Sequence, residues 1–510
     1  MMTSNAEPFM FMEYHVSATT MQVFTSVTTL PMVLKPVIGL ISDLFPIFGY
    51  NKSPYLMLTS IVGLAASILL GCAPAHAGSS LIASLLSSSG PSRFSPATIV
   101  ACCFLTNLMI TTCDTLTQGI LAAKVNTISK QEDKGNAKKG TANDIIAAFM
   151  IMARIGGLGA ALVCSMIIKH LGAPKVYIAA AIIMAPMPLF VLWRGFGERP
   201  LTEGMIAERR RFFAGQKETV GLVLLLFAGC LLNIFIPMIG GNTVNVNFAT
   251  SVVVSVLIII PFTLFLSPVL ARINLVFFLV SAVHVDINGA LVYWMIDNSY
   301  QFPGGPNFTR FFVTFWIPAI GMVFACVGTI IYKVASKGWR LKRWQVCMAV
   351  LWTPTLAMDI VWVNRWNLDT GINDVVMAVI RNGIVFAFIA LRLMPASFII
   401  PRLCPPGMEA TMSALLFGCA QMGHSVSEDV GAFVLQQFDV DPKGGFFEQH
   451  KFDQFWKVIA IQQAISFVMF VSTIPLLPDI GMEEQLLVHR HDAASHGSLW
   501  KRWRQKVAHS

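Results

Sequence analysis

The chain has 510 residues, of which 55% are apolar and only 12% are charged. Soluble domains carry about 25% charged residues, so this composition excludes a soluble protein and predicts one that is embedded in a bilayer. The formal net charge is +9. We attribute it to basic loops beside an anionic lipid leaflet and not to a nucleic-acid surface. The lipid bilayer is therefore an expected partner, and nucleic acid is not.

Apolar runs of about 20 residues recur from one end of the chain to the other, and each is long enough to cross a hydrocarbon core about 30 Å thick. These runs predict thirteen membrane spans. The predicted spans are 21–42, 55–76, 95–123, 143–170, 175–193, 218–240, 249–270, 273–296, 309–333, 343–364, 375–400, 408–436 and 455–478.

Lys and Arg residues are distributed unevenly among the segments that join these spans. If the loop after the first span is cytoplasmic, the cytoplasmic loops and the C-terminal tail hold most of the basic residues. The positive-inside rule favours this orientation over its inverse. It places the N-terminus of this sequence outside and the C-terminus in the cytoplasm.

Ten cysteines are scattered along the chain, most of them within apolar spans. None shows C-x-x-C spacing or pairing with histidine, so we predict free thiols, no disulfide framework, no metal site and no bound cofactor. The sequence also contains no hydrolase triad and no phosphate-binding loop. We therefore do not expect an enzyme.

The first span ends in the stretch LPMVLKPVIGLISDLFPIFGYNKSPY, residues 30–55. Gly39 and Asp43 lie one helical turn apart, so a neighbouring backbone can approach closely while the carboxylate meets a cation or a helix N-terminus. With Lys35 before it and Gly49 after it, the pattern resembles the helix 2–3 loop of major facilitator transporters. In its longer form it resembles the folate–biopterin transporter family, which implies a conformational role for this loop.

A second stretch, LCPPGMEAT at residues 403–411, resembles the same family. Glu409 falls in its first helical turn, where a carboxylate favours the helix dipole, and it is expected to anchor the inner loop as Asp43 does. The segments GPNF, GWR and RWNL follow in the family's order, and the details look most like its trypanosomatid branch. The resemblance covers roughly residues 8–478.

The resemblance implies an all-α polytopic membrane protein with the two-bundle fold of major facilitator type. In the family's 14-helix plan, residues 8–22 would supply the outer end of helix 1, a turn and the start of helix 2. Most of helix 1 is therefore expected to be missing, which leaves about 13 helices. The implied organisation is an N-terminal bundle at 1–194, a basic cytoplasmic linker at 195–217, an extra helix pair at 218–270, a C-terminal bundle at 271–478 and a basic cytoplasmic tail at 479–510.

Several ionisable residues fall within predicted spans, where each is costly unless it faces other helices or water. Asp114 resembles the family's acidic position in helix 4, with Gln118 where relatives often carry a second acid. Arg154, near the middle of its span, either pairs with Asp114 or meets an anionic substrate. Asp286 and Asn288 lie mid-span and are expected to face a cavity.

The later spans carry further candidates. Arg381 and Arg392 are eleven residues apart and so lie on nearly one face of a helix, where they could hold the carboxylates of a folate-like anion. Snorkelling to the inner surface is the alternative for Arg392. Asp359 is expected to be a solvated helix end. Glu428 and Asp429 are deeper than surface acids should be, and one of them is a candidate for protonation.

With the resemblance, these residues predict a secondary active transporter for folate- or pteridine-type solutes that works by alternating access and proton coupling. It is expected to be a monomer in the cell membrane. Its alternatives are a transporter of another solute, such as S-adenosylmethionine, and a truncated paralogue that does not transport. The residues expected to bind substrate are Arg154, Arg381, Arg392, Asp286 and Asn288. Those expected to couple protons are Asp114, Asp286 and Glu428.

Overall fold

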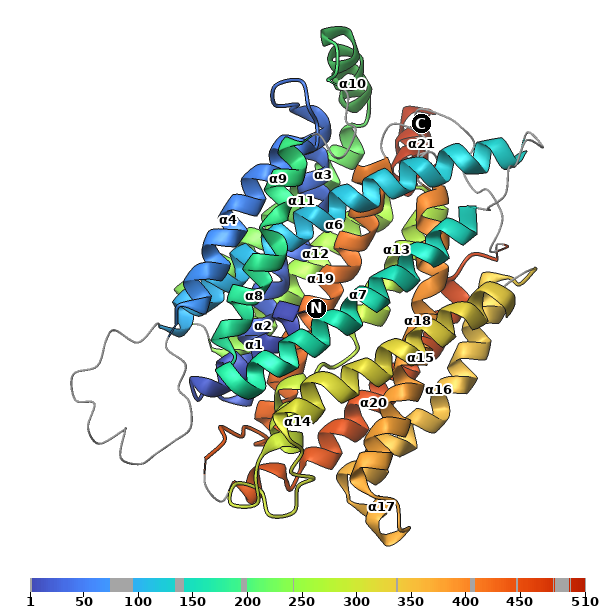
Figure 1. Cartoon of the computed structure of the whole chain (residues 1–510). Coiled ribbons are helices and arrows are strands. Elements are labelled where there is room, and N and C mark those ends of the chain that lie inside the picture. The colour runs from blue at the N-terminus through green and yellow to red at the C-terminus, as the bar shows by residue number, and fades with distance from the viewer. Residues whose placement is uncertain are drawn as a thin grey trace.

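A computed structural model describes residues 2–73, 95–133, 142–193, 200–241, 243–335, 338–403, 409–445, 448–479, 481, 495 and 497–509. Within these residues the chain is helical apart from turns, two isolated β-bridges and extended connections (Figure 1). The helices are α1 (Met2–Glu13), α2 (Ala18–Thr29), η1 (Leu30–Met32), α3 (Lys35–Leu44), α4 (Ser53–Gly71), α6 (Pro96–Asp133), α7 (Ala142–Leu171), α8 (Pro174–Met184), α9 (Pro186–Leu192), α10 (Glu203–Gly215), α11 (Lys217–Ile239), α12 (Val244–Phe265), α13 (Pro268–Ala282), α14 (Asn288–Ile296), η2 (Phe312–Trp316), α15 (Ile317–Ala335), α16 (Leu341–Val363), α17 (Trp366–Asp369), α18 (Asp374–Leu403), α19 (Glu409–Gln437), η3 (Gln449–Phe452), α20 (Phe455–Ser472), η4 (Ile474–Leu476) and α21 (Leu499–His509).

Eleven helices of the described part are long and apolar enough to cross a membrane. They coincide with eleven of the predicted spans, so the all-helical, multi-pass prediction is confirmed. The two remaining predicted spans differ from the structure. The span expected at 408–436 is α19, which has the length but carries many polar side chains, and the span expected at 273–296 is two helices. The count of thirteen is therefore not confirmed.

The N-terminal residues form a helix, a turn and a second helix. α1 is buried against α7 and α8. Ser17 then caps α2 by accepting the Thr20 amide at 3.4 Å. Pro31 and Pro36 lie at the starts of η1 and α3. A proline there lacks the amide that a continuous helix would need, so the span from Ala18 to Leu44 is divided into α2, η1 and α3.

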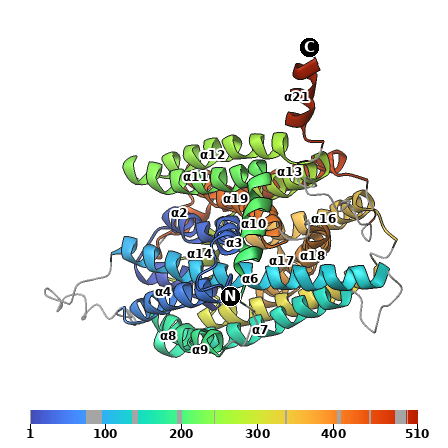
Figure 2. The ribbon, with the colours of Figure 1, turned by 90° about the horizontal axis from the view of Figure 1, so that it is seen from above.

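The spans form two bundles that meet along two pairs of helices. Between the bundles, α2 and α3 pack against α19, and α7 packs against α15. Within the N-terminal bundle, α4 packs with α6, α8 and α9. Within the C-terminal bundle, α18 packs with α15 and α16 (Figures 1 and 2). α11 and α12 lie side by side and cover α19 from outside. Consecutive spans run in opposite directions, and we name the two ends of the molecule after α10 and α17, which lie at opposite ends in Figure 1.

The break between α13 and α14 corrects the expectation of one continuous helix with Asp286 at its middle. Residues 283–287 are not helical, and neighbouring elements bind their backbone groups. The Asp286 amide donates to the Ser427 carbonyl at 3.2 Å, and Gln462 Nε2 donates to the Val285 carbonyl at 2.6 Å. Non-helical backbone is tolerated at membrane depth only when its polar groups are satisfied in this way.

Gln22 of α2 binds backbone groups on both sides of the break between α13 and α14. Its side-chain amide donates to the Asp286 carbonyl at 2.7 Å and accepts the Gly289 amide at 3.0 Å. Gly431 lets α19 approach on the other side, because a Cβ at that position would collide with the Asp286 carbonyl oxygen. The break is therefore held between α2 and α19, one from each bundle.

We predict that Gly431→Ala destabilises the protein by about 1–3 kcal/mol, the usual cost of overpacking a well-packed core. The added methyl must push residues 283–287 away from α19. The melting temperature of the purified protein measures this effect. Gly156→Ala is the matched control, because nothing lies within 4 Å of the Cβ it would add. Equal melting temperatures for both variants would contradict the close packing described here.

Asp297 follows α14 in a loop at the α17 end, outside the membrane spans. Its carboxyl group is buried, and its Oδ2 atom receives no hydrogen bond from the described residues. Burial, with a smaller effect of the Glu448 carboxylate, raises the pKa of Asp297 from 3.8 to about 7. The folded protein therefore keeps this proton up to near neutral pH, whereas the unfolded chain loses it near pH 4.

Because the folded state binds more protons than the unfolded state between these pH values, stability must fall as the pH rises from about 4 to 7. The shift corresponds to a loss on the order of 4 kcal/mol. Asp297→Asn should raise the melting temperature at pH 8 and leave it unchanged at pH 4. Asp369→Asn, which removes an exposed carboxylate at the same end, serves as the control. A pH profile of Asp297→Asn that matches the parent would disprove the assignment.

Candidate functional site

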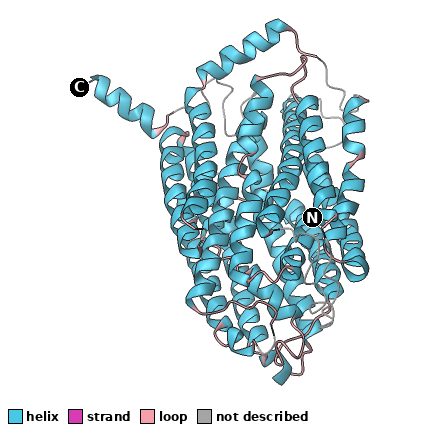
Figure 3. Cartoon of the chain, turned by 90° about the vertical axis from the view of Figure 1, so that its left-hand side faces the viewer, coloured by secondary structure: helices cyan, strands magenta, loops and turns pink. Residues whose placement is uncertain are grey.

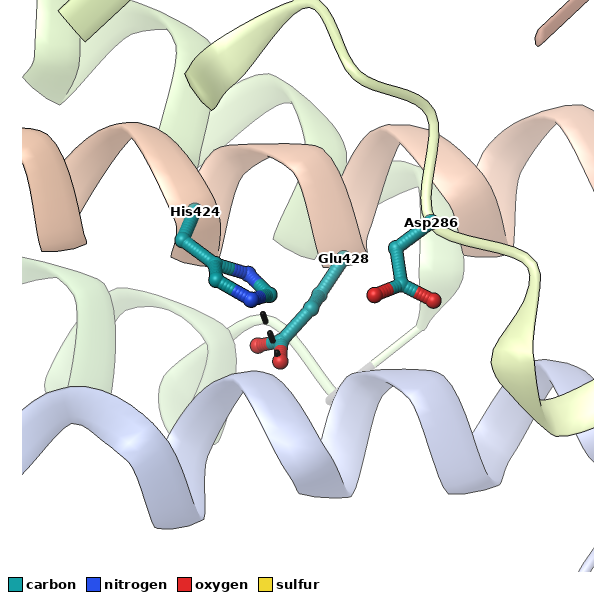
Figure 4. Close-up of side chains that lie close together, drawn as sticks. All are labelled: Asp286, His424 and Glu428. Atoms are coloured by element: carbon teal, nitrogen blue, oxygen red, sulfur yellow. Dashed lines mark ion pairs between the residues drawn. The ribbon is translucent and has the colours of Figure 1, made fainter. Parts of the chain in front are cut away.

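α19 runs through the middle of the molecule, where it contacts α2, α3, α12 and α13. Three ionisable side chains meet where it passes the break between α13 and α14 (Figure 4). Asp286 comes from the break, and His424 and Glu428 lie one turn apart on α19, so all three point toward one another. We call these three residues the α19 cluster.

The α19 cluster joins a buried group to an open one. His424 Nδ1 lies 3.7 Å from Glu428 Oε1, and one ligand atom from each of the three residues lies within 4.8 Å of the others. The side chain of Glu428 is 4% exposed and that of His424 is 52% exposed. An imidazole in this position can carry a proton between a buried carboxylate and the open space beside it.

Hydroxyl groups of α2 face the carboxylates of α19 across the boundary between the bundles. Thr29 Oγ1 donates to Glu428 Oε2 at 3.0 Å, and Ser26 Oγ donates to Asp429 Oδ1 at 2.9 Å. Both bonds connect the N-terminal bundle to the C-terminal one. α2 carries these hydroxyls on one face because positions 26 and 29 are three residues apart.

A fourth carboxylate lies close to this group. Glu7 of α1 is buried and accepts a short hydrogen bond from the Thr28 hydroxyl. Glu428 interacts electrostatically with all three other acids. The set of interior carboxylates is therefore Glu7, Asp286, Glu428 and Asp429.

Nothing in the described part of the chain pairs these four carboxylates with Lys or Arg; His424 is the one base in an ion pair with any of them. Several like charges cannot all be buried in a medium of low dielectric constant without a large cost. The arrangement is stable when protons or a cation neutralise part of the charge. One imidazole and two carboxylates are also a donor set that a metal ion accepts.

Asn288 lies at the start of α14, where its backbone N–H donates to Asp286 Oδ1 at 2.8 Å. The structure therefore brings Asp286, Asn288 and Glu428 together, as three of the predicted site residues. The arginines do not join them in ion pairs.

Arg381 is occupied by another partner. Its Nε donates to Asp359 Oδ1 at 2.6 Å, its second terminal nitrogen lies 3.3 Å from Asp359 Oδ2, and Gln463 donates to the same carboxylate. Asp359 is buried, so the expectation of a solvated helix end was wrong: the carboxylate lies one turn inside α16 and faces α18 and α20. The Arg381 guanidinium is therefore engaged by a carboxylate of the protein itself.

Arg392 lies over the ring of Phe470, 5.7 Å from its centroid, as a cation–π pair. Arg154 is partly exposed on α7, and no described residue forms an ion pair with it. Asp114 instead pairs with Lys35, so the alternative of an Arg154–Asp114 pair is wrong. The basic group that reaches Asp114 comes from the start of α3 and not from α7.

The Lys35–Asp114 pair has a short separation of 2.5 Å between Nζ and Oδ2. Gln118, one turn along α6, donates to both Asp114 oxygens at 2.9 Å. Gln118, at the position where relatives often carry a second acid, therefore binds the Asp114 carboxylate. Lys35 itself is buried, so the charge of Asp114 is balanced by a fixed partner in this conformation. Its predicted role in proton coupling stays a prediction.

The other residues of the predicted conformational loop lie at the α10 end. Gly39 is buried on α3, and Asp43 Oδ2 accepts the Thr411 hydroxyl of α19 at 2.9 Å. Gly49 has a positive φ of 79° in a tight turn, and its carbonyl accepts the Leu201 amide at 2.8 Å. Glu409 begins α19, but its side chain and the turn predicted at 405–407 lie outside the described residues.

Sequence reasoning missed Glu7, Gln22 and His424. The spacing of His424 and Glu428, four residues apart on one helix, would have identified the histidine. Nothing local marks Glu7 or Gln22, because their partners are 21 and 264 residues away in the sequence.

Comparisons with known proteins identify the family and the fold. The model of the BT1 family matches residues 1–490. The relative named "Probable folate-biopterin transporter 6" from Arabidopsis thaliana is 24% identical over 91% of this chain and 76% of its own length. "Folate transporter 2" of Plasmodium falciparum is 20% identical over 88% of this chain and 78% of its own length.

Solved structures show the same fold at low sequence identity. An auto-inhibited peptide transporter of the POT family has a TM-score of 0.55 at 14% identity and covers 95% of this chain and 98% of its own. The nucleoside transporter NupG has a TM-score of 0.52 at 12% identity and covers 94% of this chain and 100% of its own. The predicted two-bundle fold of major facilitator type is confirmed, and the protein is not an enzyme. With a family match along nearly its whole length, this chain belongs to the BT1 family of membrane transporters.

Proposed function

We propose that this protein is a proton-coupled transporter of folate- or pteridine-type solutes that works by alternating access. The single observation that carries the coupling is the α19 cluster, a buried carboxylate joined to an exposed imidazole beside a broken helix. The names of the relatives support the solute class. Discontinuous helices near the interface of the two halves are typical of transporter binding and coupling sites.

In the proposed cycle, His424 takes a proton from the open space and passes it to Glu428, with Asp286 as the adjacent acceptor. Protonation removes a buried negative charge next to the hydroxyls of α2. It therefore changes the strength of the Thr29–Glu428 bond, which joins the two bundles. A charge change at this position would bias one arrangement of the bundles over the other.

Contacts at both ends of the molecule support alternating access. At the α17 end, Asp441 Oδ1 caps α2 by accepting the Thr19 amide at 3.0 Å and hydroxyl at 2.8 Å. At the α10 end, Asp43 binds Thr411 at 2.9 Å. Each contact links α2 or α3 to the second bundle. In the proposed cycle, the first breaks when the α17 end opens and the second breaks when the α10 end opens.

We also propose the orientation, the location and the division of the chain. The α10 end would face the cytoplasm, because the basic segments lie there, and the protein would be a monomer in the cell membrane. The bundles would comprise 1–194 and 271–478, with 195–217 as the linker, 218–270 as the extra pair and 479–510 as the cytoplasmic tail. The packing of α11 and α12 on the outside of α19 supports this division.

A cationic solute is the second candidate substrate. Of the three arginines predicted to bind substrate, Arg381 pairs with Asp359, which leaves Arg154 and Arg392 without an acidic partner among the described residues, and the four interior carboxylates outnumber these two. A folate-like anion would need those arginines, whereas a cation would meet the carboxylates directly. Uptake of labelled folate and labelled biopterin in cells that lack their own carriers tests the solute class, with surface protein quantified in parallel.

We predict that Glu428→Gln abolishes the increase of uptake at acidic external pH and lowers uptake at least tenfold. The amide can still accept the Thr29 hydrogen bond but cannot carry the proton. Asp369→Asn, at an exposed position far from the cluster, should leave the pH profile unchanged. A Glu428→Gln protein with the parental pH profile would show that another group carries the proton.

Arg154→Ala should abolish folate uptake, leave biopterin uptake measurable and leave surface expression unchanged, because only the anion requires the guanidinium. Arg154→Lys retains a charge but not the planar fork and should be intermediate. Loss of surface expression in Arg154→Ala would instead show that the arginine is structural. Equal uptake of both solutes by the variant would exclude it from the binding site.

A further inference from the structure

α21, the last helix of the described chain, is built differently from the spans. Ser498 begins it, with its hydroxyl accepting the Lys501 amide at 3.3 Å. Leu499, Trp503 and Val507 recur at intervals of four, so they share one face. These side chains are 53%, 56% and 54% exposed. The sequence LWKRWRQKVAH contains no acidic residue, and Arg502, Arg504 and Lys506 flank the apolar face.

The start of α21 is fixed at the end of a span. The Trp500 ring packs on Phe265, the last residue of α12, with 5.5 Å between ring centroids. Trp500 also stacks on Trp503 at 5.3 Å, and Arg504 lies over the Trp500 ring at 5.9 Å. The helix then projects sideways from the bundle instead of continuing along the spans (Figures 2 and 3).

The position of α21 indicates which partner can cover the exposed apolar face formed by Leu499, Trp503 and Val507. Because Phe265 ends a membrane span, α21 begins at the depth of the lipid headgroups. A helix with tryptophan and leucine on one face and basic residues beside them is typical of helices that lie in the plane of a membrane surface. Each Lys or Arg near an anionic leaflet adds electrostatic attraction to the lipid phosphates and carboxylates.

We propose that α21 docks on the anionic phospholipid headgroups of the leaflet at the α10 end. Leu499, Trp503 and Val507 enter the boundary between headgroups and acyl chains, and Arg502 and Lys506 meet the negative headgroups. Neither the transport cycle nor the solute class enters this inference.

Hydrogen–deuterium exchange of the full-length protein in nanodiscs tests the proposal. Amides of residues 499–509 should exchange at least tenfold more slowly in phosphatidylcholine with phosphatidylserine than in phosphatidylcholine alone. Salt at about 1 M should reverse the difference, because charges are then screened beyond about 3 Å. Exchange rates that do not depend on phosphatidylserine would overturn the proposal.

Two pairs of variants sharpen the test. Arg502→Gln with Lys506→Gln should remove the dependence on phosphatidylserine. Lys342→Gln with Arg343→Gln removes the same charge at the start of α16 and should retain it. Trp503→Gln should speed exchange in both lipids. Equal effects of the two charge pairs would overturn the assignment to α21. Protection of residues 499–509 that depends on the number of protein copies in each disc would also overturn the proposal, because a second copy would then cover the apolar face of α21.

Discussion

A polar group that leaves water must find a partner inside the bundle, and the broken helix around Asp286 depends on this constraint. The amide and carbonyl groups of residues 283–287 would be too costly in lipid, so α2, α19 and α20 each supply hydrogen-bonding groups to them. Gly431 makes the approach of α19 possible. The break thus joins the two bundles because its backbone can be satisfied only by both.

The same constraint governs the interior charges. Three acidic positions are neutralised or partly satisfied by fixed partners: Asp114 by Lys35, Asp359 by Arg381, and Asp374 by Arg365. The carboxylates around α19 receive hydroxyl and imidazole partners but no guanidinium or ammonium group among the described residues. In the proposed cycle, this difference would separate acids with a fixed cationic partner from acids whose charge changes.

The membrane surface sets a further boundary. Residues at the α10 end include the tight turn at Gly49, which binds the chain at Leu201, and α21, which starts against α12. These elements lie where the spans leave lipid, so their basic and aromatic side chains meet headgroups and water together. In the proposed cycle, the bundles would therefore have to move while these contacts hold the ends of the spans.

The sequence alone determined the membrane class, the positions of eleven spans and the family, because apolar length and the Lys35–Gly49 and 403–411 motifs are local features. It also singled out Asp286, Asn288 and Glu428, which the structure brings close together and whose roles stay predictions. Only the tertiary structure decided the partners: Lys35 and not Arg154 for Asp114, Asp359 for Arg381, and α2 for the acids of α19. Such pairs join residues 22 to 403 positions apart, and no pattern of spacing specifies which buried charges or hydroxyls the packing of helices brings together.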